Sequence, residues 1–313
     1  MNFFKNAIFY CLKDCPVQEA LEAALAEGAF VPPGTQEMTR SGWVAPAEGL
    51  DESLVLASET QEGGHAMTIT LRTDTKIIPA ATLRDHVEAQ VKAIEEQQGR
   101  KVFRRERTQL KDEAILDLLP RAFTRRQHTR ALLIPAAGLL VVEATSYRIA
   151  EDLLSALRGA LGSLRVTLPD VKQSPGAIMS QWIEGAATQI GRFTVLDECN
   201  LRSTLVEGAD IKLRGQDLAN PDIVAHIGNG NLVTRLALEW NDYLVLRLCE
   251  DLRVLRICTT DTFNEQRADE ADDLIKCQAD LLLMAACLRQ LFKDITGAFG
   301  GLVETPVADK TAA

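Results

Sequence analysis

Basic side chains crowd into one stretch of this 313-residue chain, and their number and spacing suit the binding of an anion. Between residues 100 and 130 there are ten basic and four acidic residues, a net charge of +6, although the whole chain carries a formal charge of −10. The basic residues are Arg100, Lys101, Arg104, Arg105, Arg107, Lys111, Arg121, Arg125, Arg126 and Arg130. The rest of the chain therefore carries −16. This separation predicts a polyanion-binding face on an otherwise repulsive surface, since phosphates attract lysine and arginine whatever the sequence.

Two Asp-x-Lys fragments permit a different chemistry. Asp170-Val171-Lys172 and Asp210-Ile211-Lys212 resemble pieces of nuclease sites, in which carboxylates bind Mg²⁺ and a lysine supports the attacking water. Such fragments arise easily by chance in a chain that is 25% charged. The chain has no P-loop, nucleophile-elbow, zincin or dinucleotide-binding motif, and its four histidines and seven cysteines are scattered. We therefore expect no catalysis, cofactor or metal, and keep a Mg²⁺-dependent nuclease using Asp170 and Asp210 as the alternative.

The basic stretch has no recognised base-reading motif beside it. Zinc-finger, basic-zipper and RNP patterns do not occur. Aromatic residues make up only 5% of the chain, which argues against a platform that stacks single-stranded bases. The sequence thus favours contacts with a nucleic-acid backbone, to a duplex more than to exposed bases.

Alternating strand and helix patterns predict an α+β fold with antiparallel or mixed sheets and helices on one face. We expect a central α+β domain from residues 1–78 plus 125–168 and a C-terminal α+β domain at 169–303. Between them, residues 79–124 predict a protruding helical subdomain, with helices at 81–98 and 108–119. Residues 304–313 are expected to be a disordered tail. The chain has neither a long uncharged apolar run nor a good signal peptide, so we expect no membrane segment and a cytoplasmic location.

The last long helix, predicted at 268–298, carries leucines seven residues apart. Leu274, Leu281 and Leu288 begin a heptad seam of about three repeats. Such a seam either pairs with a second chain or packs on the sheet of its own domain, and the second arrangement is the more common one. A protein-interaction scaffold built on this seam is a third functional hypothesis.

Eight short motifs follow one another along nearly the whole chain. They are FKN at 4–6, GTQEM at 34–38, GWV at 42–44, KIIP at 76–79, LKDE at 110–113, LLPRAFTR at 118–125, LGSL at 161–164 and QDL at 216–218. The longest of them, LLPRAFTR, is specific, and the shorter ones gain weight from their order. Together they resemble the bacterial recombination-associated protein RdgC family.

The resemblance implies a function without catalysis. Members of that family bind DNA as a closed ring of two subunits around the duplex and restrain the RecA recombinase by occupying DNA. This chain is then expected to be a nucleoid-associated homodimer that binds duplex DNA, with single-stranded DNA left open. One dimer contact would join the helical inserts and the other the C-terminal domains, where the seam of Leu274, Leu281 and Leu288 is the candidate helix.

The resemblance also assigns roles to single residues. Phe123, with Leu119 beside it, would close the gate between the two inserts. Lys76 and Arg121 match motif positions that face the hole. The remaining candidate DNA contacts are Arg100, Lys101, Arg104, Arg105, Arg125, Arg126, Lys212 and Arg214. The family is more basic just before Gln216 than this chain is, which places the share of Lys212 and Arg214 in question.

Overall fold

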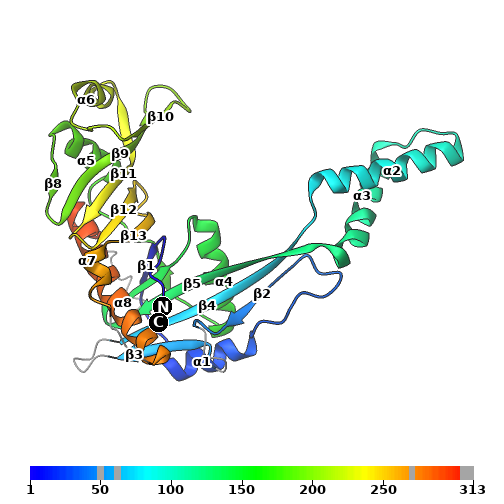
Figure 1. Ribbon diagram of the computed structural model, residues 1–313, viewed down its shortest axis with the longest axis horizontal. Helices are drawn as coiled ribbons and strands as arrows, with labels where there is room; N and C mark the ends of the chain where they lie inside the picture. Colours follow the sequence, from blue (N-terminus) through cyan, green and yellow to red (C-terminus); the bar gives the residue numbers. More distant parts are fainter. Residues whose placement is uncertain (48–52, 60–64, 268–271, 304–313) are drawn as a thin grey trace, which may run out of the picture. The chain divides into compact units, whose positions relative to one another are not determined.

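The computed structural model describes residues 1–47, 53–59, 65–267 and 272–303 (Figure 1). Within these residues the strands form two antiparallel sheets and eight α-helices accompany them, so the predicted α+β class is confirmed. The chain divides into two compact units. Unit 1 comprises Met1–Ala24, Ala45–Ile69 and Thr129–Ala313, and unit 2 comprises Leu25–Val44 and Thr70–His128.

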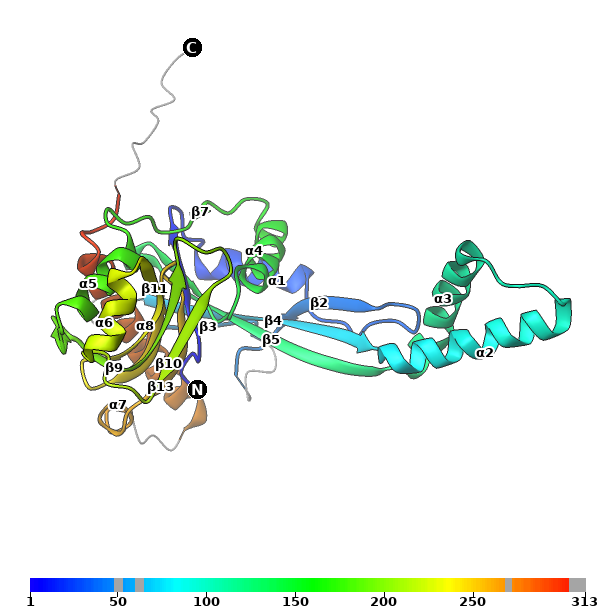
Figure 2. The same cartoon turned by 90° about the horizontal axis from the view of Figure 1, so that it is seen from above.

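Unit 2 contains the basic stretch. Its strand β2 (Thr39–Val44) pairs antiparallel with the second half of β4 (His65–Ile77). Helices α2 (Ala80–Gln98) and α3 (Arg104–Leu118) follow, then the 3-10 turn η1 (Leu119–Arg121) and the first residues of β5 (Phe123–Ile134). The two helices lie side by side, joined at Gly99, whose left-handed φ of 62° ends α2 (Figure 2). Both predicted helices are present, and their protrusion as a subdomain stays a prediction.

The structure extends two elements beyond their predicted bounds. Helix α3 begins at Arg104, so the arginines that precede the predicted start at 108 are helical. Strand β5 begins at Phe123, inside the range 79–124 that was predicted as the helical subdomain. Residues 123–126 are exposed, so this part of the strand has no alternation of buried and exposed residues to reveal it.

A close backbone contact explains the GWV motif of unit 2. The chain at residues 28–30 runs beside β2, where the Phe30 N–H donates to the Trp43 carbonyl at 2.9 Å and the Trp43 N–H to the Gly28 carbonyl at 3.0 Å. A Cβ at Gly42 would lie 2.5 Å from the Cα of Phe30. Only glycine therefore allows this approach of two backbone segments.

The two sheets differ in strand order. The seven-stranded sheet has the order β2-β4-β5-β6-β1-β7, with β3 paired to β4. Besides β2, β4 and β5, it contains β1 (Ile8–Leu12), β3 (Val55–Glu59), β6 (Leu139–Val142) and β7 (Val166–Thr167). The six-stranded sheet has the order β10-β9-β11-β12-β13, with β8 paired to β9. Its strands are β8 (Gln189–Ile190), β9 (Phe193–Ser203), β10 (Asp210–Arg214), β11 (Asn231–Trp240), β12 (Leu244–Cys249) and β13 (Val254–Thr259).

The remaining helices belong to unit 1, apart from the end of α1. They are α1 (Gln18–Glu27), α4 (Tyr147–Leu161), α5 (Pro175–Glu184), α6 (Pro221–Gly228), α7 (Asp261–Asn264) and α8 (Asp273–Ala298), with the 3-10 turn η2 (Pro135–Ala137). Helix α8 begins at the cap Asp272, and the first residues of its predicted range, 268–271, lie outside the described residues. Strand β9 runs without a break from Phe193 to Ser203, and the chain bends at residues 204–206.

One apolar core fills unit 1. It joins the N-terminal strand to the C-terminal elements, since the rings of Phe9 and Phe292 lie 5.1 Å apart and those of Trp182 and Phe299 stack at 5.7 Å. Residues from both the predicted central and C-terminal domains contribute to it. The division into three domains stays a prediction.

Gly42→Ala should lower the free energy of unfolding by about 1–3 kcal/mol or more, because the added methyl group meets backbone that cannot rotate away. Gly159→Ala is the control, since Gly159 lies in helix α4 with no atom within 4 Å of an added Cβ, and alanine favours helix there. Urea denaturation of the two variants measures the difference. Equal stability of both variants would contradict the contact at Gly42.

Candidate nucleic-acid interface

The first turn of α3 exposes basic side chains of unit 2. Arg104 and Arg105 are both exposed, and no ion pair within the described parts of the chain involves either of them. Arg100 instead donates twice to Glu106, at 2.7 Å from each terminal nitrogen, while Lys101 is exposed. Arg104 and Arg105 therefore keep their guanidinium donors available for an external anion, and Arg100 would first have to leave Glu106.

A second exposed group lies where η1 meets β5. Arg121, Arg125 and Arg126 are all exposed. The Arg126 Nε lies 3.9 Å from an oxygen of Asp74, whereas Arg121 and Arg125 form no ion pair among the described residues. Successive residues of a strand face opposite sides, so Arg125 and Arg126 present charge on both faces of this end of β5.

A buried carboxylate, Asp74, organises the charge beside this strand. Arg72 donates to both its oxygens, at 2.8 and 2.7 Å, and stacks on Phe30 with 4.0 Å from guanidinium carbon to ring centre. Hydrogen bonds from Arg72 lower the pKa of Asp74 below its ordinary value. Burial, followed by the charges of Arg72 and Arg126, lowers the pKa of His128. With Asp74 ionised, the group formed by Arg72, Arg126 and Asp74 still carries a net charge of +1.

Lys76 occupies a different environment from the other predicted DNA contacts. It is 9% exposed, and its ammonium donates to the carbonyls of Gly34 and Thr35 at 2.7 and 2.6 Å. Its backbone N–H donates to the carbonyl of Met38 at 2.8 Å. The motifs at 34–38 and 76–79 therefore contact each other, and two of the three N–H donors of the Lys76 ammonium bind the backbone of Gly34 and Thr35. Of the predicted cations, Lys76 is the least available to a phosphate.

The two gate candidates differ sharply in exposure. Phe123 is 87% exposed, while Leu119 is 3% exposed within its own unit. Phe123 is therefore not a core aromatic of unit 2, as an ordinary aromatic at a helix end would be. Leu119 packs inside the unit and supports the turn that carries Phe123.

A polar face of the six-stranded sheet gathers cations that sequence reasoning missed. Arg214 pairs with Glu198 at 3.3 Å, and Arg247 also contacts Glu198 from β12. The register places Lys212 opposite Asn200, which in turn faces Arg235. Arg202, also on β9, pairs with Glu250 at 2.9 Å. Only Lys212 and Arg214 lie in a basic tripeptide visible in the sequence; the other arginines are brought to this face by strand pairing.

The leucine seam of α8 is mostly internal. Leu281 and Leu288 are fully buried, whereas Leu274 is 43% exposed. This burial matches a helix packed on its own unit, the more common of the two arrangements considered for the seam. At the described start of α8, Leu274 and Ile275 remain exposed and could meet a second chain.

The carboxylates of the nuclease alternative do not form a metal cluster. Asp170 uses its backbone carbonyl to accept from Val303, and Asp210 lies opposite Arg202 in the β9–β10 pair. The residues that the structure describes contain no group of three or more His, Cys, Asp or Glu side chains placed to hold a metal ion.

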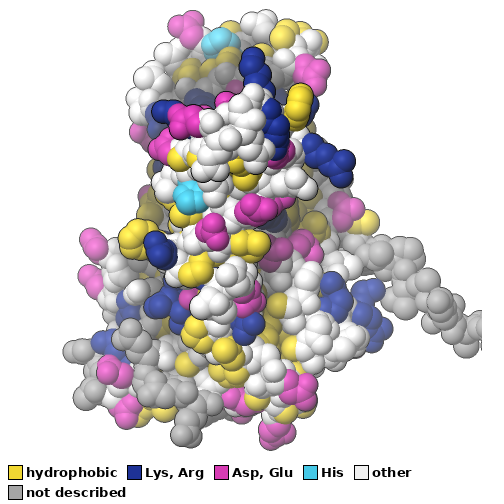
Figure 3. Space-filling view, turned by 90° about the vertical axis from the view of Figure 1, so that its right-hand side faces the viewer, with side chains coloured by type: hydrophobic (Ala, Val, Ile, Leu, Met, Phe, Trp, Pro, Cys, Tyr) yellow, Lys and Arg dark blue, Asp and Glu magenta, His cyan; other side chains and the backbone are white. Residues whose placement is uncertain are grey.

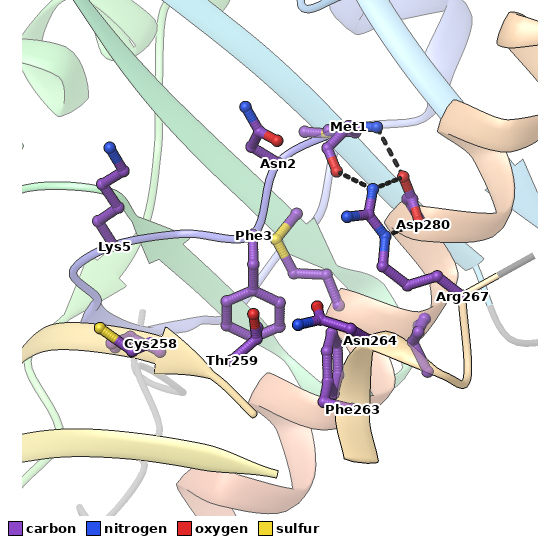
Figure 4. Close-up of a pocket in the computed structure, with 13 residues that line it drawn as sticks. Met1, Asn2, Phe3, Lys5, Cys258, Thr259, Phe263, Asn264, Arg267 and Asp280 are labelled. Carbon is purple, nitrogen blue, oxygen red and sulfur yellow. Dashed lines mark hydrogen bonds and ion pairs between the residues drawn. The ribbon is translucent and has the colours of Figure 1, made fainter. Parts of the chain in front are cut away.

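Unit 1 also contains a cavity of about 410 Å³ (Figure 4). Arg267 and Asp280 face one another in its wall and hydrogen-bond twice, at 2.9 and 2.6 Å. Phe3 and Phe263 pack edge to face, with ring centres 5.2 Å apart. Arg267 and Asp280 therefore satisfy one another, whereas Lys5, which also lines the cavity, takes no part in this pair.

The surface does not segregate its charge completely. Over the face drawn in Figure 3, lysine and arginine side chains alternate with aspartate and glutamate. Binding of a polyanion to such a surface depends on particular exposed arginines, because neighbouring acids weaken the average field.

The family model that matches the chain and the related proteins found for it agree. The family model described as "RdgC: Putative exonuclease, RdgC" matches residues 2–302. A recombination-associated protein RdgC of Pseudomonas fluorescens (strain Pf0-1) is 39% identical over 311 residues, covering 97% of this chain and 99% of its own. The protein of that name from Pseudomonas aeruginosa PAO1 is 38% identical, over 96% of this chain and 97% of its own. The one from Proteus mirabilis HI4320 is 36% identical, over 97% of this chain and 100% of its own.

Among the described helices, none combines the length and apolar character needed to cross a membrane.

Asp74→Asn should lower the free energy of unfolding by about 1–3 kcal/mol at neutral pH, since a charged hydrogen-bond acceptor of Arg72 is lost. The carboxyl pKa of Asp74 is lowered in the folded state, so its contribution is present above its ordinary pKa and is lost as pH falls through the lowered value. The difference between wild type and variant should therefore shrink below about pH 4. Urea denaturation at several pH values tests this, and a difference independent of pH would contradict it.

Proposed function

The chain belongs to the RdgC family of recombination-associated proteins, and on that premise we propose that it binds the backbone of duplex DNA without reading the base sequence. Two copies would close around the duplex, and occupation of DNA would limit access by the RecA recombinase. No catalytic step is required for this function.

The exposed arginines of unit 2 carry the proposal. Arg104, Arg105, Arg121 and Arg125 are exposed and form no ion pair among the described residues, in a chain whose formal charge is −10. Such side chains gain from phosphate contact and release condensed counterions from DNA. They come from a helix and a strand end without an accompanying reading helix, so they fix position on DNA and do not specify sequence.

Ring closure is supported by Phe123. An aromatic side chain that is 87% exposed at a strand start is costly in water, and burial against a second copy would remove that cost. The buried Leu119, four residues earlier, holds the 3-10 turn in place. The second contact between copies is assigned to the start of α8, where Leu274 is exposed.

An exonuclease is the second candidate, because the printed description of the family model contains that term. The names of the curated relatives carry only the association with recombination. Incubation of linear and supercoiled DNA with protein and Mg²⁺ separates the two. Degradation or nicking that is abolished by Asp170→Ala or Asp210→Ala would contradict binding without catalysis.

Arg125→Glu combined with Arg126→Glu should weaken binding to unrelated duplexes by the same factor. If each arginine meets one phosphate, the slope of log affinity against log salt concentration should become shallower by about 2. Lys13→Glu combined with Lys293→Glu is the matched control, since both lysines are exposed in unit 1 and the charge change is equal. Fluorescence anisotropy over a salt series measures the slopes, and an unchanged slope for the arginine variant means that these side chains do not meet phosphate.

Phe123→Ser should weaken association between copies while changing the melting temperature little, because the ring contacts no core of its own unit. Leu119→Ser is the contrasting variant and should lower the melting temperature by several degrees, since it removes a buried apolar side chain. Sedimentation velocity reports association, and calorimetry reports stability. A large loss of stability in Phe123→Ser would instead show that Phe123 is part of the core of unit 2.

A further inference from the structure

A groove of about 500 Å³ lies between α2 and α3 in unit 2, apart from the strand end that carries Arg125. Its floor is apolar: Leu83 is half-buried, and Val87 is 7% exposed. Helix α2 contributes these residues at i and i+4, which places them on one face of the helix. An apolar floor of this kind favours a ligand with an apolar side chain.

The walls of the groove are strongly basic. Its lining includes Arg84 from α2 and Arg104, Arg107 and Lys111 from α3, and one carboxylate, Glu88. The only ion pair among these lining groups joins Arg107 to Glu88 at 3.7 Å, with both side chains more than half exposed. An exposed pair of this length contributes about 1 kcal/mol or less, so an incoming carboxylate can replace Glu88 at low cost.

The spacing of the cations limits the shape of the ligand. Arg104, Arg107 and Lys111 follow one another at three- and four-residue intervals on one stripe of α3. The first and last are about 10 Å apart along the helix axis. In an extended peptide, side chains two and four residues apart lie on the same face, and those four residues apart are separated by about 13 Å, a span that the long arginine and lysine side chains can cover. Two carboxylates on either side of an apolar residue would therefore match both the walls and the floor.

We propose that the α2–α3 groove is a docking site for an acidic peptide segment of a partner protein, in extended conformation, with an apolar side chain seated on Leu83 and Val87. Duplex DNA suits this groove less well, because a sugar–phosphate backbone has no apolar side chain to cover the floor. The proposal goes beyond DNA binding and does not depend on it, although Arg104 belongs both to the groove and to the proposed DNA contacts. It gives the helices of unit 2 a protein-recognition role of their own.

The test uses the full chain and a fluorescein-labelled peptide with the core Asp-Asp-Leu-Phe-Asp-Asp. Two control peptides keep its length, one with Leu-Phe replaced by Ser-Ser and one with every Asp replaced by Asn. We expect saturable binding of the first peptide, and at least about tenfold weaker binding of each control, because each control removes one of the two matched features. Absence of binding, or equal binding of the Ser-Ser peptide, overturns the proposal without involving any variant of the protein.

Matched protein variants then locate the site. Arg104→Glu with Lys111→Glu reverses two lining charges and should weaken peptide binding about tenfold or more. Lys101→Glu with Arg105→Glu makes the same charge change at exposed positions outside the lining and should change it by about twofold at most in moderate salt. Equal effects of the two pairs overturn the proposal.

Competition with a duplex separates this groove from the DNA interface. We expect a short duplex to leave most of the peptide bound to the Arg105→Glu, Arg121→Glu, Arg125→Glu variant, which keeps every lining residue of the groove and loses three of the four arginines on which the proposed DNA binding rests. The proposal fails if the duplex displaces the peptide fully from that variant and the Arg104→Glu, Lys111→Glu variant loses as much affinity for DNA as for the peptide. The groove would then belong to the DNA interface.

Discussion

The carboxylate of Asp74, buried under Arg72 and 3.9 Å from Arg126, is the fixed negative charge beside the basic strand end of unit 2. Arg72, which is hydrogen-bonded to Asp74, stacks on the ring of Phe30. The backbone of Phe30 in turn lies against β2 at Gly42, where only glycine fits. A buried charge is stable only when its hydrogen-bonding partners are complete, so this arrangement leaves little freedom to the strands that carry it. The exposed arginines of β5 are presented from that rigid base, which reduces the entropy that phosphate contact would cost.

Pairing with carboxylates divides the cations of the chain into two classes. Arg100, Arg202, Arg214 and Arg247 already contact glutamates, and Lys76 holds two backbone carbonyls. Arg104, Arg105, Arg121 and Arg125 have no such partner among the described residues. An anion must compete with a glutamate for the first class but not for the second. In the proposed DNA binding, the six-stranded sheet would contribute through the exposed Lys212 and by exchange of its surface ion pairs.

The sequence predicted the fold class, the long helices and the location of exposed positive charge, because these depend on periodicity and composition. It did not predict that strand β5 starts at Phe123, since exposed polar residues on both faces carry no period. Nor did it show that Arg202, Arg235 and Arg247 share a face with Lys212, which follows from strand register alone. The motif residues Gly42 and Lys76 were visible as motifs, but their physical reasons, a backbone contact and two carbonyl hydrogen bonds, needed the tertiary structure.

Backbone binding without sequence readout is the central claim, and the salt dependence of affinity for two duplexes of unrelated sequence tests it most directly. Fluorescence anisotropy of wild-type protein with both duplexes, from low to moderate salt, gives two lines of log affinity against log salt concentration. The account predicts steep lines that coincide, since phosphate contacts release counterions equally from any sequence. Flat lines, a difference between the duplexes of more than about tenfold, or no binding at the lowest salt would contradict it.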